Sequence, residues 1–123
     1  MPARKPPLEK TIQKNILAAL RATPWIYAWR NNVGNARTLD GKRRYRFGLA
    51  GSADITGILA PDGRRLEIEV KRPGLGQLRP AQIRFGQRIL DMGGIYIVAT
   101  SVEDVFEQLK GYGYPKSRVE YDS

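Results

Sequence analysis

The sequence contains neither cysteine nor histidine. Without cysteine the chain cannot form disulfides or use a thiolate nucleophile, and without both residue types it lacks the usual protein ligands of zinc. The absence of histidine also removes imidazole as a general acid or base. Any hydrolysis would therefore depend on carboxylates, lysine, hydroxyl groups and a metal ion bound through oxygen.

Long apolar runs are also missing. No stretch approaches the roughly 18 apolar residues of a membrane-spanning helix. The N-terminal MPARKPP has no apolar segment after its charged residues, so it does not have the pattern of a signal peptide. The lack of cysteine fits a reducing compartment. We therefore expect a cytoplasmic protein that does not enter a membrane.

Acidic residues are scarce relative to basic ones. Twelve Asp and Glu stand against 21 Lys and Arg, which gives a formal net charge of +9. This charge favours a polyanionic partner, with nucleic acid as the first expectation and an anionic membrane surface as the second. The alternative is a basic soluble protein with no such partner.

The 123 residues suffice for one domain around one core, and 41% hydrophobic residues are typical of a globular chain. We therefore expect a single domain over 1–123, with loose tails at 1–7 and 115–123. Apolar periodicity and turn signals predict the order helix, three strands, helix, strand, helix. The strand-helix-strand unit near the C-terminus implies a parallel pair with a right-handed crossover. The predicted fold class is α/β, with a mixed four-stranded sheet flanked by helices.

Residues 52–72 predict a β-hairpin with a turn near Pro61. With a four-residue turn at 60–63, paired residue numbers sum to 123 and Asp54 lies opposite Glu69. With a two-residue turn the sum is 125, and Asp54 lies opposite Lys71. In both registers these three polar side chains share one face of the hairpin, because side chains alternate with a period of two.

Two opposed carboxylates repel each other, and a divalent cation between them removes the repulsion. Mg²⁺ accepts one or two carboxylates and retains several waters, which leaves room for a phosphate oxygen. A lysine beside the cation can hold the attacking water or stabilise the charge of the transition state. This face therefore predicts metal-dependent phosphodiester cleavage. The alternative is a solvated hairpin face on which Glu and Lys serve only solubility.

Three segments carry a resemblance to a known family: GSADITGIL, LEIEVK and GQLRPAQIRFGQRILDMGGIYIVATSVEDV. Together they resemble the virus-type replication-repair nucleases (VRR-NUC) of the PD-(D/E)xK nuclease superfamily, over a match from Glu9 to Val105. The valine within EVK and the glutamine early in the next helix make this match more specific than D…ExK alone. The resemblance implies a restriction-endonuclease-like αβββαβ core.

The resemblance also implies roles for individual residues. Asp54 and Glu69 would be metal carboxylates for Mg²⁺ or Mn²⁺, and the carbonyl of Val70 would add a ligand. Lys71 would be the catalytic lysine. Gln82 would be the helix glutamine near the active site, although a polar surface position explains it as well.

Two glutamates stand outside the clear motif. In this family a first-helix glutamate often completes the metal shell, and Glu9 is the candidate. A first-turn glutamate that is favoured by the helix dipole is an equally good explanation of Glu9. Glu67 shares the face of Glu69 but lacks the Glu-x-Lys spacing, so we treat it as peripheral.

Positive charge is concentrated between residues 37 and 46, which we predict to be a loop or a projecting hairpin, and in the Gly-rich connection after Lys71. Arginine binds phosphates through paired hydrogen bonds, and the interleaved Tyr45 and Phe47 could stack on bases. A solvated charged hairpin is the alternative. Neither segment shows a base-reading pattern, so we expect recognition of backbone or structure. The predicted DNA-binding residues are Arg37, Lys42, Arg43, Arg44, Arg46, Arg72 and Arg79.

These patterns and the resemblance together predict a Mg²⁺- or Mn²⁺-dependent endonuclease that cuts branched DNA, with the four-way Holliday junction as the expected substrate. The resemblance further implies a homodimer in the cytoplasm of a bacterial cell or a phage-infected host. The candidate dimer surface is the last helix with residues 111–115, unless Phe106, Tyr112 and Tyr114 pack on the sheet instead. The alternative functions are a non-catalytic nucleic-acid-binding module and a less specific DNA nuclease.

Overall fold

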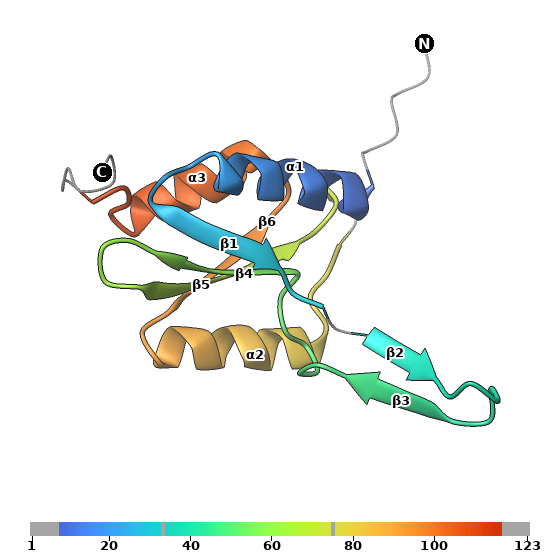
Figure 1. Ribbon diagram of the computed structural model, residues 1–123. Coiled ribbons are helices and arrows are strands. Elements are labelled where there is room, and N and C mark those ends of the chain that lie inside the picture. The colour runs from blue at the N-terminus through green and yellow to red at the C-terminus, as the bar shows by residue number, and fades with distance from the viewer. Residues whose placement is uncertain (1–7, 33, 75, 117–123) are drawn as a thin grey trace, which may run out of the picture.

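A four-stranded mixed sheet forms the middle layer of the protein, with helices on both faces (Figure 1). The computed structural model describes residues 8–32, 34–74 and 76–116, and only the backbone of residues 35, 46 and 47. The elements are α1 (Glu9–Arg21), β1 (Ile26–Arg30), β2 (Gly34–Arg37), β3 (Arg44–Phe47), β4 (Ile55–Leu59), β5 (Arg64–Val70), α2 (Pro80–Asp91), β6 (Ile95–Ala99) and α3 (Val102–Gly111).

The main sheet has the strand order β1-β4-β5-β6. Strand β4 is antiparallel to both of its neighbours, β1 and β5, whereas β5 and β6 are parallel and are joined through α2. Helices α1 and α3 pack on one face, and α2 covers β5 and β6 on the other (Figure 1). The predicted α/β class and mixed four-stranded sheet are therefore confirmed.

The apolar core lies between the sheet and the α1/α3 layer. Helix α1 supplies Ile12, Ile16 and Leu20, which recur at helical spacing and are almost completely buried. The alternate residues of β5 that we expected to be apolar and buried, from Leu66 to Val70, are also in this cluster. Their burial fixes which face of β5 is left for the polar side chains.

The hairpin of β4 and β5 adopts the first of the two predicted registers. Ile55 pairs with Ile68 and Leu59 pairs with Arg64, so paired numbers sum to 123. Asp54 directly precedes β4 and therefore lies beside Glu69, as this register requires.

The polar face of β5 is buried and not solvated, which contradicts the simplest alternative from the sequence. Glu67 and Glu69 are 2% and 4% exposed. Alternating polar residues on a strand are typical of a surface, but α2 lies over this face and covers both carboxylates. Burying a carboxylate is costly unless it gains partners, so these side chains are not present for solubility.

Strands β2 and β3 form a separate two-stranded sheet that projects from the body of the protein (Figure 1). This is the hairpin form of the two predicted possibilities. Its tip is held by Asp40, whose carboxylate accepts hydrogen bonds from the Thr38 hydroxyl and the Lys42 amide. These bonds lower the pKa of Asp40. The carboxylate is thereby used within the turn.

The C-terminal aromatic residues pack inward. Tyr114 is in the core and stacks on Trp25 at 5.9 Å between ring centroids, and Phe106 meets Trp25 edge-on. Phe106 and Tyr112 are partly buried against the same core. The packing alternative is therefore confirmed for these aromatic side chains, and the last helix as a dimer surface stays a prediction. Of the predicted tails, 1–7 and 117–123 lie outside the described residues.

Among residues 8–116, apart from 33 and 75, no helix combines the length and the apolar character that crossing a membrane requires.

Candidate active site

A cleft of about 370 Å³ opens at the edge of the sheet where β5 ends. It lies between the first turns of α1 and α2 and the loop that leads into β4. Five residues that we predicted to be catalytic or metal-binding line it: Glu9, Asp54, Glu69, Lys71 and Gln82. The fold thus brings together side chains that are up to 73 positions apart in the sequence, from residue 9 to residue 82.

Asp54 is held by the backbone of the neighbouring strand. Its Oδ2 accepts a hydrogen bond of 2.8 Å from the amide of Val70, and its own carbonyl accepts one of 2.9 Å from the amide of Asn31. The carboxylate is therefore fixed between β1 and β5, beside Glu69. Burial raises its pKa above the ordinary value, with a further contribution from the charge of Glu9.

Glu69 is oriented by α2. Its Oε1 accepts a hydrogen bond of 2.7 Å from Nε2 of Gln82. Gln82 is itself held, because its Oε1 accepts from the amide of Arg79 at the start of the helix. The other carboxylate oxygen of Glu69 is buried and has no hydrogen-bond partner among the described residues. Oε2 of Glu67 is buried without a partner in the same way, but the oxygen of Glu69 belongs to a residue that lines the cleft, where a cation could reach it.

Burial and the adjacent charge of Asp54 raise the pKa of Glu69 to about 7. The charge of Glu9 acts in the same direction, while the ammonium of Lys71 opposes it. Burial, together with the charges of Glu69, Asp54 and Glu67, raises the pKa of Tyr96 on β6 to about 12. Burial is the main cause of these shifts, and the neighbouring carboxylates add to it.

Lys71 follows β5 and points into the same cleft. Its Nζ lies 3.7 Å from Oε1 of Glu69, and its side chain is 11% exposed. A loop packs on the aliphatic part of this side chain, since a Cβ on Gly76 would lie 2.7 Å from the Lys71 Cδ. The lack of a side chain at Gly76 permits this approach of the loop to Lys71.

The donor set fits an oxygen-bound divalent cation. The cleft contains carboxylates and no nitrogen or sulfur ligand of the kind that zinc prefers, and one buried oxygen of Glu69 is unpartnered. The described residues contain no group of three Asp or Glu side chains close enough to hold an ion by themselves. Mg²⁺ needs only one or two protein carboxylates, so Asp54 and Glu69 are sufficient. A direct role for Glu9 stays a prediction.

Val70 and Glu67, which flank Glu69 on β5, do not line the cleft. Val70 has its side chain in the core and its amide bonded to Asp54, and it is not among the residues that line the cleft. Its carbonyl as a metal ligand stays a prediction. Glu67 also lies outside the cleft, and its Oε1 pairs with Nη2 of Arg65 at 3.1 Å. This agrees with our peripheral assignment.

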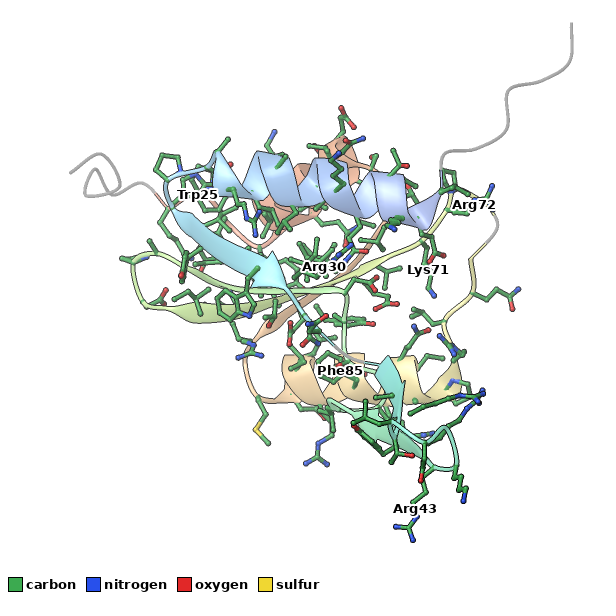
Figure 2. All side chains as sticks on the ribbon, turned by 45° about the vertical axis from the view of Figure 1, so that its right-hand side comes forward. Trp25, Arg30, Arg43, Lys71, Arg72 and Phe85 are labelled. Atoms are coloured by element: carbon green, nitrogen blue, oxygen red, sulfur yellow. The ribbon has the colours of Figure 1, made fainter. Side chains whose placement is uncertain are left out.

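The predicted DNA-binding residues do not all surround the cleft. Arg79 lines it, as do Gly34 and Gly48 at the base of the β2–β3 hairpin. The cationic side chains of the hairpin lie farther out, and Figure 2 shows Arg43 near its far end. Arg72 lies near the start of α1 (Figure 2). The side chain of Arg46 lies outside the described ones.

Two residues near the cleft were missed from the sequence. Asn31 donates from Nδ2 to Oγ of Ser52 and to the carbonyl of Ala53, which ties the loop before Asp54 to the end of β1. Arg30 is close enough to lower the pKa of Asp54. The sequence places both residues directly after the apolar part of β1, which could have marked them as candidates. It does not show that this end of β1 adjoins Asp54.

A scan against models of protein families and a search of curated proteins found no match to this chain. The resemblance described above therefore depends on the motif residues themselves.

Proposed function

We propose that the protein is a Mg²⁺- or Mn²⁺-dependent endonuclease that hydrolyses phosphodiester bonds in branched DNA, with the four-way junction as the first substrate to test and a homodimer as the acting form. The element order α1-β1-β4-β5-α2-β6 supports a restriction-endonuclease-like αβββαβ core, with the β2–β3 hairpin inserted after its first strand.

The observation that carries the proposal is the composition of the cleft. The buried Glu69, the half-buried Asp54 and a lysine converge there, in a chain that has a net charge of +9. A phosphodiesterase needs positive surface to bind the nucleic-acid backbone and local negative charge to bind a metal. This combination distinguishes the site from an ordinary buried ion pair.

Each residue has a distinct part in the proposed reaction. Asp54 and Glu69 would hold a divalent cation, which when bound would polarise the scissile phosphodiester and favour loss of a proton from the attacking water. Lys71 positions that water or stabilises the negative charge that develops at the phosphate as the 3′ oxygen departs. Gln82 is a positioning residue, because its hydrogen bond fixes the carboxylate of Glu69.

The β2–β3 hairpin supports a nucleic-acid substrate. Arg37 and Arg44 are directly paired across its two strands, and like charges in this position destabilise a hairpin. Bound phosphates would remove that repulsion and form paired hydrogen bonds with the guanidinium groups. The arrangement therefore favours a polyanion at this surface.

The test uses labelled four-way junction, flap and linear duplex DNA, each incubated with Mg²⁺, Mn²⁺ or EDTA. We expect metal-dependent cutting with a preference for the branched substrates. Lys71→Ala should cut at least ~100-fold more slowly, the usual effect of removing one electrostatic contact to a transition state, and should bind within ~3-fold of the wild type. Its control is Glu67→Gln, which removes a charge from a buried position of β5 outside the cleft and should still cut.

Unchanged cutting by Lys71→Ala, or wild-type cutting in EDTA, would contradict the proposed mechanism. Tight binding with no cutting in either metal would favour the non-catalytic binding module.

A further inference from the structure

A second hollow of about 540 Å³ lies along α1 beside the end of the edge strand β1. We call it the α1 groove. Its floor contains apolar atoms of Leu17 and Ala18 and the amide of Gln13. Four cationic side chains complete its lining: Lys10, Lys14, Arg21 and Arg30. No predicted DNA-binding residue belongs to it.

The groove is lined by positive charge with no opposing carboxylate. All four cationic side chains are exposed, and none forms an ion pair with a described residue. Elsewhere Arg65 and Lys71 are paired with glutamates. Like charges four residues apart on a helix, such as Lys10 and Lys14, destabilise it by a few tenths of a kcal/mol. The stability of α1 therefore does not account for this arrangement.

The groove adjoins the active-site cleft. Lys10 follows Glu9, which lines that cleft, and Arg30 lies close enough to Asp54 to interact with its charge. Figure 2 shows Arg30 near the end of β1, whereas Arg43 lies at the far end of the hairpin. The two cationic surfaces thus approach the cleft from different directions.

The dimensions suit an extended anion. Lys10 and Arg21 are 11 residues apart on α1, which corresponds to ~16 Å along the helix axis at ~1.5 Å per residue. Double-stranded DNA rises ~3.4 Å per base pair, so the groove spans about five base pairs. A single phosphate or nucleotide would engage only a part of it.

We propose that the α1 groove binds the sugar-phosphate backbone of a nucleic-acid segment that leaves the active-site cleft along α1. The proposal rests on the proposed function and extends it, since the substrate then continues past the cleft on the α1 side as well as toward the hairpin. The cations bind phosphates without sequence information, and the apolar floor fits the sugar edge. A substrate with two segments at the cleft, such as branched DNA, would occupy both surfaces.

The test measures DNA binding in EDTA, so that cleavage does not interfere. Fluorescence anisotropy with a labelled four-way junction is recorded over a range of salt concentrations for the wild type and for Lys10→Gln/Lys14→Gln. The matched control is Arg88→Gln/Lys110→Gln, which removes the same charge from exposed positions near the ends of α2 and α3. Thermal melting verifies that each variant is folded.

Loss of two phosphate contacts should reduce the slope of log K against log salt by ~1.8, from ~0.9 per contact, and should weaken binding at least ~10-fold near 0.1 M salt. The control pair should stay within ~2-fold of the wild type. Equal weakening by both pairs would show a general charge effect, and no weakening would leave the groove without nucleic acid; either result overturns the proposal. The proposal is also overturned if Lys10→Gln/Lys14→Gln binds DNA as the wild type does but loses binding to anionic lipid vesicles. The two proposals can fail separately. If the wild type does not cut DNA but Lys10→Gln/Lys14→Gln binds DNA more weakly than the wild type does, the nuclease proposal fails and the groove proposal stands.

Discussion

Glu69 combines a cost for folding with the role of metal ligand that we propose for it. It is almost completely buried, lies beside another carboxylate and has one oxygen without a hydrogen-bond partner among the described residues. Among the described residues, only the amide of Gln82 and the ammonium of Lys71 offset the burial of its charge. A bound divalent cation would neutralise both carboxylates and complete the missing coordination.

This residue makes the metal-free protein sensitive to pH. The folded-state pKa of Glu69 is about 7, above its ordinary value of 4.5, so the folded protein binds this proton more tightly than the unfolded chain. The associated stability is therefore fully present below pH ~4.5 and is lost as the pH rises through ~7. In EDTA, the unfolding free energy of the wild type should therefore fall between these two pH values. We expect this fall to be smaller in Glu69→Gln, by on the order of 2 kcal/mol.

Urea unfolding at several pH values measures this effect. Glu107→Gln on the exposed side of α3 is the control and should keep the pH dependence of the wild type. A Glu69→Gln curve that runs parallel to the wild-type curve would show that Glu69 is ionised without penalty in the folded protein.

At the scale of elements, the cleft depends on how the loop before β4 meets α2. Gly51 has a φ of +78°, and a Cβ at this position would lie 2.4 Å from the carbonyl oxygen of Ala81. Glycine is therefore required both for the backbone conformation and for the close approach. This contact places the loop that leads to Asp54 against the first turn of α2, which carries Gln82.

Gly51→Ala should lower the unfolding free energy by about 2–4 kcal/mol, because the strained conformation and the steric overlap with the helix backbone both contribute. Gly63→Ala is the matched control, since Gly63 has a φ of +73° but open space where a Cβ would lie. It should cost only about 1 kcal/mol. Equal losses in the two variants, measured by urea unfolding, would show that the contact with α2 is unimportant.

Much of this element order was predictable because local signals agreed. Helical spacing in α1, the turn near Pro61 and the apolar run of β6 each define one element. The hairpin arithmetic even placed Asp54 and Glu69 on one face before the register was known. The burial of Glu67 and Glu69 was not predictable, because it results from α2, which lies more than ten residues later in the sequence and packs over them.

Some residues of the site could not be predicted from the sequence, because they belong to elements that are distant from the motif along the chain. Residues of the motif, such as Lys71, were identified because their spacing along one strand has a direct geometric meaning. Arg30, Asn31 and the cations of α1 belong to other elements, and only the tertiary arrangement brings them near the cleft.

At the scale of the whole molecule, charge of opposite sign is separated in space. The chain is positive overall, with exposed cations on the hairpin and along α1, whereas three carboxylates, those of Glu9, Asp54 and Glu69, line one cleft. A polyanion would be attracted to the surface from a distance of about a Debye length, while a cation would be attracted only locally. The central claim is therefore that Asp54 and Glu69 bind a divalent cation.

Calorimetric titration of the full chain with Mn²⁺ tests this claim most directly. We expect the wild type and Glu67→Gln to bind Mn²⁺, and Asp54→Asn and Glu69→Gln to bind it at least ~10-fold more weakly, a loss of ~1.4 kcal/mol or more. Asn at position 54 can still accept the hydrogen bond from the Val70 amide, so the fold should be retained. Wild-type protein that binds no Mn²⁺, or a Glu69→Gln variant that binds it as tightly as the wild type, would contradict the account.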